Sequence, residues 1–598
     1  MTFHFSLSTS ARSSLTTFVC LGCAIAATVL FFYGPLVSRV HSLQNPYSFS
    51  GDALQHIAPF WHIREPAELS RDYILNYYYQ AILPVGYKIM YFLVTEFLTP
   101  PVACKLVAVL LSLVFIGCTV ASTRYIAGTP AAFVSLVLAT GAVIKNSYFM
   151  GGLQRGFGIA LAAFMINALL RGNFRAMCVV TLLSFSLYPA GGILCMATLV
   201  LFSILPSSYG GYTGATRTWQ RVLVLGCLSI CIIAVVAPQL VGGSRYGERL
   251  SLENEQEFAE WGPAGRYTQG DRGVPIPLWS SIYSESVRTL VVDRPPTSED
   301  SEGDLVTPKT GALIVLASIV LCCGLVWWLD GFALSLLALR LTIFAGASVG
   351  SYLLATSLFP LLYIPSRYVI VAVPCLMPII VPLMISHCAS RALHARGALI
   401  KRVAPVLIGC IVCVALGWHS LQVRPLSTVD GYRDLFRFME RLPRDVVIAG
   451  WPRGVLSTIP FFTGRSVLIY EEGHQIFHRD FLLEMRRRMD ATVAVFGAID
   501  ATPLQQLRQD FKVTHLLITR TQLQKTPRYF APFGDQIARL RESRRGQTLY
   551  LEQILERCVV FKAHNLLLLD LSRLDPQTGG AADEAAPLSL SEAKKTSL

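Results

Sequence analysis

A series of apolar segments, each close to the length of a bilayer crossing, recurs in this chain from residue 14 to residue 422. A helix needs about 20 mainly apolar residues to cross the hydrocarbon core, and lipid accepts only backbone that satisfies its own hydrogen bonds. Of the 598 residues, 53% are hydrophobic and 15% are charged, which is too apolar for a soluble multidomain protein. The sequence therefore predicts a polytopic α-helical membrane protein.

Hydropathy predicts about eleven spans. In chain order they cover residues 14–37, 101–122, 129–146, 157–172, 176–189, 190–206, 220–241, 311–329, 338–358, 368–386 and 403–422. The segment 176–206 is divided at Tyr188-Pro189, and the two short halves are typical of broken helices that line a cavity. A single crossing there would move every later loop to the other side of the membrane.

The formal net charge of +13 reflects topology rather than nucleic-acid binding. Arg and Lys gather in alternate short loops, which predicts a cytoplasmic N-terminus. The basic residues of these inner loops are Arg124, Arg171, Arg175, Arg217, Arg221, Arg340, Arg391, Arg396, Lys401 and Arg402. The loops 38–100 and 242–310 then lie on the outer side. Because the chain has no Asn-x-Ser/Thr sequon, we expect a bacterial inner (plasma) membrane.

Residues 1–423 form the predicted membrane domain, and the composition changes after it. We expect helices over 430–442, 478–498 and 502–511, strands over 446–450, 466–470 and 515–519, and a last strand pair near 548–551 and 558–570. Short apolar strands that alternate with helices favour an α/β domain with a largely parallel sheet. This domain, 424–574, is predicted to be extracytoplasmic (periplasmic or extracellular), and the tail 575–598 is predicted to be disordered.

Three charged residues stand out on the outer side. Asp52 follows Gly51 in a polar stretch of the first outer loop. A carboxylate so close to lipid is costly and usually has a functional role. Arg155 and Arg367 are lone arginines in short outer turns, where Arg either contacts lipid headgroups or pairs with a phosphate. If both arginines meet Asp52 at one cavity, they would suit a phosphate-bearing lipid.

Other segments have a plain structural interpretation. The aromatic stretch 70–80 and the segment 87–98 are predicted to form helices that lie at the membrane interface and anchor the domain. Segment 471–478 contains His474 and His478, but because no third ligand is evident it is interpreted as a solvated loop. No nucleotide-binding glycine motif is present.

The chain resembles the GT-C superfamily of integral-membrane glycosyltransferases, of the protein mannosyltransferase and aminoarabinose transferase type, and more closely a little-characterised bacterial branch of it. The residues that carry the resemblance are Gly51-Asp52, Gln55-His56, Asp72-Tyr73 and the stretch 84–87, followed by the turns at Arg155 and Arg367. Many relatives have paired acids where this chain has Asp52 alone. A divalent metal ion is therefore left open.

The resemblance implies transfer of a sugar, with inversion, from a polyprenyl-phosphate donor to an acceptor on the outer face. Asp52 would be the general base, and Arg155 and Arg367 would bind the donor phosphate. The acceptor, a lipid, a glycan or a protein, would contact a secondary group of residues. These are Gln55, His56, Asp72 and Tyr78. No nucleotide cofactor is required, because the prenyl phosphate is already a leaving group.

Two alternatives stay open. A flippase of lipid-linked saccharide would normally have charges within its spans and an inverted repeat, and neither is evident here. A non-catalytic protein of cell-envelope polysaccharide assembly is favoured by the single acid at Asp52. The deciding structural question is whether Asp52, Arg155 and Arg367 meet.

Overall fold

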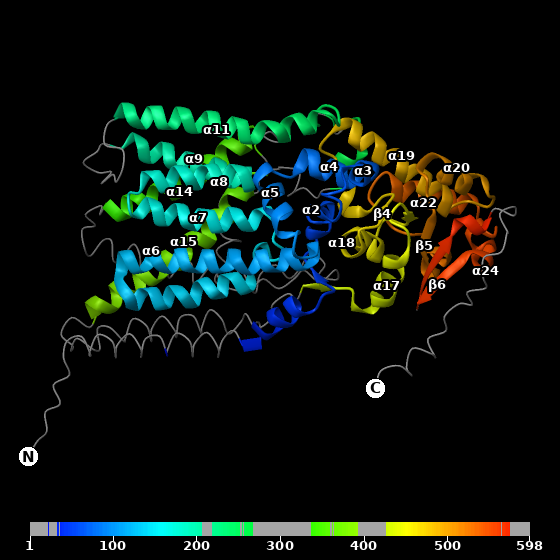
Figure 1. Ribbon diagram of the computed structural model, residues 1–598, viewed down its shortest axis with the longest axis horizontal. Coiled ribbons are helices and arrows are strands. Elements are labelled where there is room, and N and C mark those ends of the chain that lie inside the picture. Colours follow the sequence, from blue (N-terminus) through cyan, green and yellow to red (C-terminus); the bar gives the residue numbers. More distant parts are fainter. Residues whose placement is uncertain are drawn as a thin grey trace, which may run out of the picture.

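The computed structural model describes residues 22, 33–34, 36–205, 218–250, 254, 256–262, 264–266, 336–358, 362, 364–392, 426–563 and 565–574. A bundle of long helices occupies one end of the elongated molecule and a domain with a sheet occupies the other, with short helices between them (Figure 1). The predicted spans 311–329 and 403–422, most of the first span, most of the loop 242–310 and the tail 575–598 lie outside the described residues.

Apolar helices form the bundle. Those described are α6 (Pro100–Lys145), α7 (Gln154–Leu170), α8 (Phe174–Leu187), α9 (Pro189–Ile204), α11 (Thr218–Ser244), α14 (Leu336–Ser357) and α15 (Ser366–Ala392). Four of them, α6, α11, α14 and α15, are long and apolar enough to cross a membrane. The described residues thus support an integral membrane protein but do not confirm about eleven spans.

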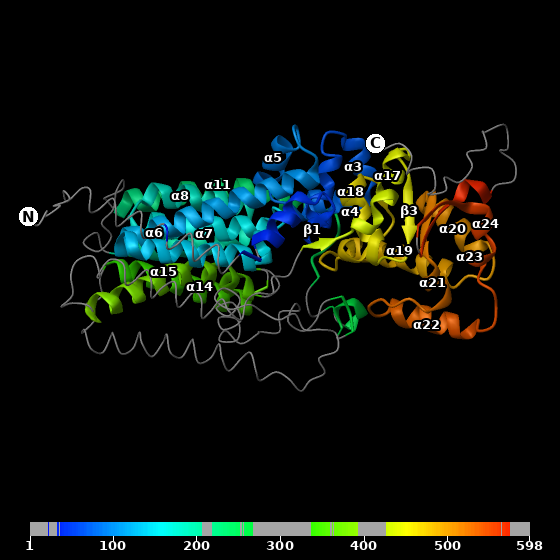
Figure 2. The ribbon, with the colours of Figure 1, turned by 90° about the horizontal axis from the view of Figure 1, so that it is seen from below.

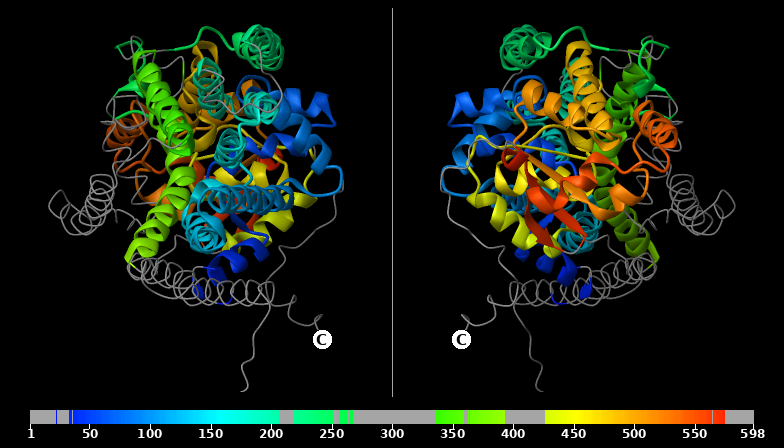
Figure 3. Two further views of the ribbon diagram at one scale, coloured as in Figure 1. Left: turned by 90° about the vertical axis from the view of Figure 1, so that its left-hand side faces the viewer. Right: turned by 90° about the vertical axis from the view of Figure 1, so that its right-hand side faces the viewer.

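The helices pack side by side along the long axis. Figure 2 shows α14 and α15 along one side of the bundle, against α6 and α7. In both views of Figure 3, α11 stands at the edge of the bundle, and only 11% of its apolar window is buried within the protein. A helix with so much apolar surface outside the protein core suits a lipid environment.

Two helix breaks predicted from the sequence are present. Gly128, with φ +79° and ψ −175°, interrupts α6 two residues before Pro130. The chain folds back there, so that the Thr123 hydroxyl can donate to Ser135 Oγ at 3.0 Å. Tyr188, with φ −155°, separates α8 from α9, as expected for an extended residue before proline.

Basic side chains of the predicted inner loops gather at one end of the bundle. The Arg171 guanidinium lies 5.1 Å from the centre of the Tyr125 ring, and Arg340 Nη1 donates to the Leu170 carbonyl at 2.6 Å. The opposite end of the bundle meets residues 38–100. The side of the membrane that each end faces stays a prediction.

Residues 38–100, the predicted first outer loop, fold into short helices, which confirms that this segment is structured. They are α2 (Ala53–His56), η1 (Ala58–Trp61), α3 (Pro66–Arg71), α4 (Tyr73–Tyr77), η2 (Tyr78–Ile82) and α5 (Val85–Val94). A two-residue strand, β1 (Ser48–Phe49), pairs antiparallel with β2 (Ser427–Thr428). The first outer loop is thereby tied to the start of the C-terminal domain.

The C-terminal domain contains a five-stranded mixed sheet in the order β4-β3-β5-β7-β6. Its strands are β3 (Val447–Gly450), β4 (Ser466–Val467), β5 (His515–Thr519), β6 (Val559–Ala563) and β7 (Leu566–Asp570). The strands β3, β4 and β5 are parallel, whereas β7 is antiparallel to both β5 and β6. The sheet is therefore parallel in one half only, because a connection as short as that between β6 and β7 joins antiparallel strands.

Helices cover this sheet, in the domain that faces the viewer on the right of Figure 3. The longest are α17 (Arg433–Arg441), α19 (Arg479–Phe496), α20 (Thr502–Phe511) and α22 (Phe533–Ser543). The shorter ones are η7 (Gly454–Thr458), α18 (Ile459–Thr463), η8 (Glu471–Gly473), α21 (Arg520–Gln524), α23 (Tyr550–Gln553) and α24 (Leu555–Cys558). The predicted strand over 548–551 is wrong, because Tyr550 begins a helix. So short an apolar run does not distinguish strand from helix.

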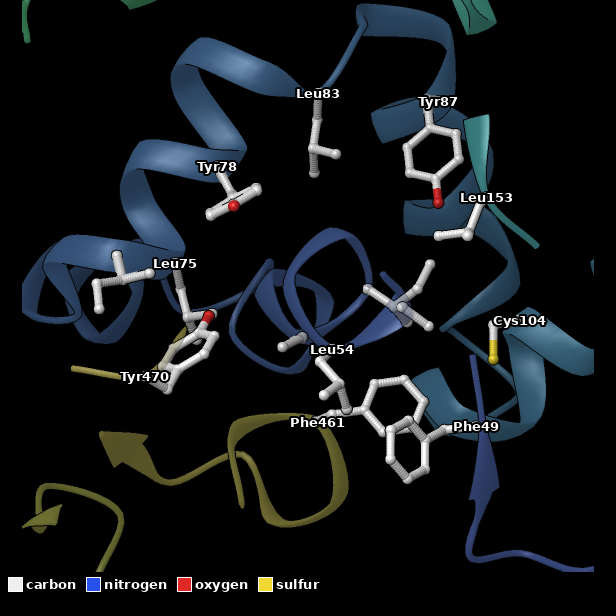
Figure 4. Close-up of a cluster of buried hydrophobic side chains, with 14 of the residues drawn as sticks. Phe49, Leu54, Leu75, Tyr78, Leu83, Tyr87, Cys104, Leu153, Phe461 and Tyr470 are labelled. Atoms are coloured by element: carbon white, nitrogen blue, oxygen red, sulfur yellow. The ribbon is translucent and has the colours of Figure 1, made fainter. Parts of the chain in front are cut away.

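One apolar core runs through the bundle, the first outer loop and the C-terminal domain. Figure 4 shows the part around α2, where side chains from all three regions meet. The outer loop contributes Phe49, Leu54, Leu75, Tyr78, Leu83 and Tyr87, the bundle Cys104 and Leu153, and the C-terminal domain Phe461 and Tyr470. The short helix α2 would be unstable alone, and this packing holds it in place.

A second attachment holds the C-terminal domain through residues that follow α11. The Glu260 carboxylate has no solvent exposure and accepts two hydrogen bonds from Arg486 of α19, at 2.6 and 2.5 Å. Glu257 pairs with Arg479 on the surface, where its side chain is 44% exposed. Removing one partner of a buried ion pair destabilises a protein far more than removing one partner of an exposed pair.

We expect Glu260→Ala to destabilise the protein by about 3 kcal/mol, because Arg486 would keep its charge in a partly buried place without a partner. Thermal unfolding of the detergent-solubilised chain measures this loss. Glu257→Ala is the matched control and should cost less than about 1 kcal/mol, since its ion pair is exposed. Equal losses for the two variants would show that the buried pair is not the stronger attachment.

Candidate functional site

Asp52 lies at the start of α2, at the end of the bundle that meets the outer loop. Its backbone is helical (φ −68°, ψ −13°) and its side chain does not cap α2. The carboxylate instead forms an ion pair with Arg155, with Oδ2 and Nη1 2.6 Å apart. The Asp52 side chain remains 37% exposed, so a ligand can reach it.

A glycine turn brings Arg155 to this place. Gly151 and Gly152 have φ of +76° and +58°, which favours glycine. A Cβ on Gly152 would clash with the Tyr91 hydroxyl and the backbone of Cys104. The hydroxyls of Tyr87 and Tyr91 donate to the Gly152 carbonyl at 3.0 and 2.9 Å. The turn is therefore anchored to α5, and Arg155 follows in the first turn of α7.

His56 lies four residues after Asp52, on the same short helix. Gln154 Nε2 lies 3.4 Å from His56 Nδ1, and the His56 ring meets the Tyr78 ring edge-on at 5.6 Å. Burial lowers the pKa of His56 to about 4, against the opposing charge of Asp52. His56 is thus neutral at pH 7. With Nδ1 accepting from the Gln154 amide, its Nε2 carries the proton and is a donor.

Arg367, in the first turn of α15, completes the charged group. Burial by itself would raise the pKa of Asp52, but the guanidinium charges of Arg155 and Arg367 hold it below its ordinary value. Within the described ranges, no carboxylate forms an ion pair with Arg367. With neutral His56, one carboxylate and two guanidinium groups leave one surplus positive charge. Such a site favours an anion.

The remaining predicted residues have different surroundings. Gln55 is buried, and its Oε1 has no hydrogen-bond partner among the described residues. The Asp72 carboxylate caps α4 by accepting from the Leu75 amide at 2.8 Å. Tyr78 is buried and donates to the Glu472 carbonyl at 2.9 Å. Asp72 is used structurally, away from the charged group, whereas Tyr78 packs beside it through His56.

Two further residues that contact or surround the charged group could not be predicted from the sequence. The Arg155 guanidinium lies 4.4 Å from the centre of the Tyr148 ring. Glu472, from η8, pairs with Arg266 at 3.1 Å. Burial raises the pKa of Glu472, and the nearby charge of Asp52 raises it as well. No local pattern marked Glu472, because its proximity to Asp52 comes from docking of the C-terminal domain.

The interpretation of 471–478 as a solvated loop is wrong. His474 has no solvent exposure and its ring packs at 4.9 Å from Phe530. The side chain of His478 instead meets the Tyr77 hydroxyl, with Nδ1 and Oη 2.9 Å apart. The two histidines, four residues apart, therefore contact different partners, and burial of this segment makes it part of the domain core.

The charged group does not fit a divalent metal ion. Asp52 is already paired with Arg155, and Nδ1 of His56, a second candidate ligand on the same helix, is occupied by Gln154. In the part of the chain that the structure describes, no three His, Cys, Asp or Glu side chains form a cluster suited to a metal. Our mechanism therefore assigns no step to a metal ion.

No family model matches the chain, and no curated protein matches it in sequence. Three solved structures illustrate what it is similar to. The Archaeoglobus fulgidus oligosaccharyltransferase tethered with an acceptor peptide is 11% identical over 88% of this chain and 72% of its own, with a TM-score of 0.48. AglB of the same organism, in complex with an inhibitory peptide and a dolichol-phosphate, is 11% identical over 92% of this chain and 74% of its own, with a TM-score of 0.46. ArnT from Cupriavidus metallidurans bound to undecaprenyl phosphate is 13% identical over 90% of this chain and 97% of its own, with a TM-score of 0.36.

These neighbours are GT-C superfamily membrane glycosyltransferases, the superfamily that the sequence resembles. The TM-scores lie below 0.5 and the identities are low. The likeness therefore carries no argument about the chemistry of this chain, which is derived from the site alone.

Gly152→Ala should lower the thermal stability of the detergent-solubilised protein by several degrees. The added methyl group meets the Cys104 backbone and requires a positive φ. Gly117→Ala is the control, because Gly117 lies within helix α6 and a Cβ there meets nothing within 4 Å. If Gly152→Ala unfolds at the temperature of the control, the turn does not need glycine for the reason given.

Proposed function

We propose that the chain is a membrane glycosyltransferase that moves a sugar from a polyprenyl-phosphate donor to an acceptor hydroxyl, with inversion at the anomeric carbon. The observation that carries this proposal is the meeting of Asp52, Arg155 and Arg367 at one end of an apolar bundle. A base (Asp52) beside an anion site (Arg155 and Arg367) at the end of a membrane-type helix bundle suits a lipid-linked anionic donor.

The proposed reaction forms one bond and breaks another at the anomeric carbon. The acceptor oxygen attacks this carbon while its proton passes to the Asp52 carboxylate. The bond from the anomeric carbon to the phosphate oxygen breaks with its electron pair, and the polyprenyl phosphate leaves. Attack opposite the leaving group inverts the configuration.

Arg155 and Arg367 stabilise the charge that develops on the departing phosphate. Preorganised donors in a site of low dielectric constant are effective at this, because they need little reorganisation during the reaction. A sugar joined to a prenyl chain through one phosphate carries one negative charge, which matches the one surplus positive charge of the group. A guanidinium also fits two phosphate oxygens at once.

His56 and Gln154 are the proposed contacts of the transferred sugar or of the acceptor. A neutral His56 with a proton on Nε2 can donate to a hydroxyl without competing with Asp52 for the reacting proton. We further propose that the site faces the outer side of a bacterial inner membrane, since the inner-loop arginines lie at the other end.

Asp52→Asn should reduce transfer by a factor of about 100 or more, because an amide cannot accept the acceptor proton. Transfer is measured in proteoliposomes with radiolabelled sugars on undecaprenyl phosphate, offered with a panel of acceptors. Asp434→Asn is the matched control, since the Asp434 side chain is 65% exposed on the surface. Wild-type transfer by Asp52→Asn would eliminate the base. Wild-type protein that only translocates the donor would favour the flippase alternative.

The pH profile offers a second test. Asp52 works as a base only when ionised, so activity is lost as pH falls through its pKa, which Arg155 holds below the ordinary value. In Arg155→Gln this lowering is lost, and the acid limb of kcat/KM should move to higher pH. The readout is the position of the limb, not the residual rate. A limb that stays in place would contradict the role of the ion pair.

A further inference from the structure

The break between α8 and α9 places Tyr188 beside the charged group. Its ring packs against Gly158 of α7 and Gly191 of α9, so closely that a Cβ on either glycine would lie 2.5 or 3.1 Å from Tyr188 Cδ1. The side chain is 5% exposed. The two glycines thus make room for the ring and hold it in one orientation.

The Tyr188 hydroxyl is buried beside the Arg367 guanidinium, with which it has an electrostatic and a hydrogen-bonding contact. A guanidinium has only donors, so this contact can use only the oxygen of Tyr188 and leaves its O–H proton without an acceptor among the described residues. A buried O–H without an acceptor is costly, and Arg367 itself has no paired carboxylate among the described residues. A ligand with an acceptor oxygen and a negative charge would satisfy both groups.

Arg155 presents a second unmet donor. Its Nη1 holds Asp52, while its Nε is buried without a partner in the described part of the chain. A guanidinium has five N–H donors in a fixed fork, so one Arg155 can hold the carboxylate and still donate to an anion. The Nε of Arg155, the hydroxyl of Tyr188 and the guanidinium of Arg367 together need an acceptor with several oxygens.

Resting on the proposed function, we propose that Tyr188 is a positioning residue for the donor, and that its hydroxyl donates to an oxygen of the phosphate bound between Arg367 and Arg155. A phosphate has enough acceptor oxygens for all three donors, whereas a sugar hydroxyl has neither the charge nor the number. The residues of α9 begin directly after Tyr188, so the positive end of this 16-residue helix also lies at the site.

The test is binding of undecaprenyl phosphate to the full-length chain in detergent. Tyr188→Phe keeps the ring between the two glycines and removes only the hydroxyl, and we expect it to weaken binding about tenfold. Tyr470→Phe is the matched control, because the Tyr470 hydroxyl is also buried without a partner in the described residues but belongs to the C-terminal domain. Its affinity should equal that of wild type.

Further arms separate the possible failures. If wild type binds undecaprenyl phosphate, Arg367→Gln loses binding and Tyr188→Phe binds like wild type, the inference about Tyr188 is wrong and the proposed function stands. If wild type does not bind undecaprenyl phosphate, both fail. If excess phosphatidylglycerol displaces the probe as well as unlabelled undecaprenyl phosphate does, the site recognises any lipid headgroup and the assignment to a donor is overturned.

A kinetic readout distinguishes positioning from a structural effect. In transfer assays Tyr188→Phe should raise KM for the donor about tenfold and leave the acid limb of the pH profile unchanged, since Asp52 keeps its partner Arg155. A fall in kcat with unchanged KM, or a moved acid limb, would contradict a role confined to the donor phosphate.

Discussion

The ion pair between Asp52 and Arg155 is the interaction on which the proposed chemistry depends. A carboxylate near the end of an apolar bundle is costly unless a cation compensates it, and here the two partners come from different elements. Asp52 is held because α2 is packed between bundle, outer loop and C-terminal domain. Arg155 is held because two glycines with positive φ let the chain turn tightly against α5. Packing and backbone geometry thus fix the distance between base and cation.

The surroundings of this pair divide into two sides. Arg367 and Tyr188 come from ends of bundle helices and leave a positive charge and a hydroxyl unmatched within the described residues, which suits an anionic lipid carrier. On the other side, η8 of the C-terminal domain brings Glu472 with its partner Arg266 close to α2. In the proposed function, an anion bound on the bundle side would keep the donor apart from an acceptor on the domain side, as a transfer between two bound substrates requires.

Much of this arrangement follows from local sequence. The breaks at Gly128 and Tyr188 could be predicted because each lies just before a proline, which has no backbone N–H for a helical hydrogen bond. Asp52, Arg155 and Arg367 could be recognised from the sequence because a charged side chain close to lipid is costly and is usually kept for a function. The errors have equally local causes. The apolar run around Tyr550 was too short to distinguish a strand from a helix. The polar composition of 471–478 suggested exposure to solvent, but His474 is buried by aromatic side chains distant in sequence.

We could predict an apolar bundle, its basic loops, a C-terminal domain with a sheet and the three charged residues most worth testing from the amino-acid sequence, since hydropathy, helix breaking and charge are properties of short segments. The three-dimensional fold was needed to show that Asp52 pairs with Arg155, that Asp72 caps a helix instead, and that Tyr188 and Glu472 belong to the surroundings of the site. Those relations join residues up to 420 positions apart, and such contacts are set by packing of whole helices, which no local pattern encodes.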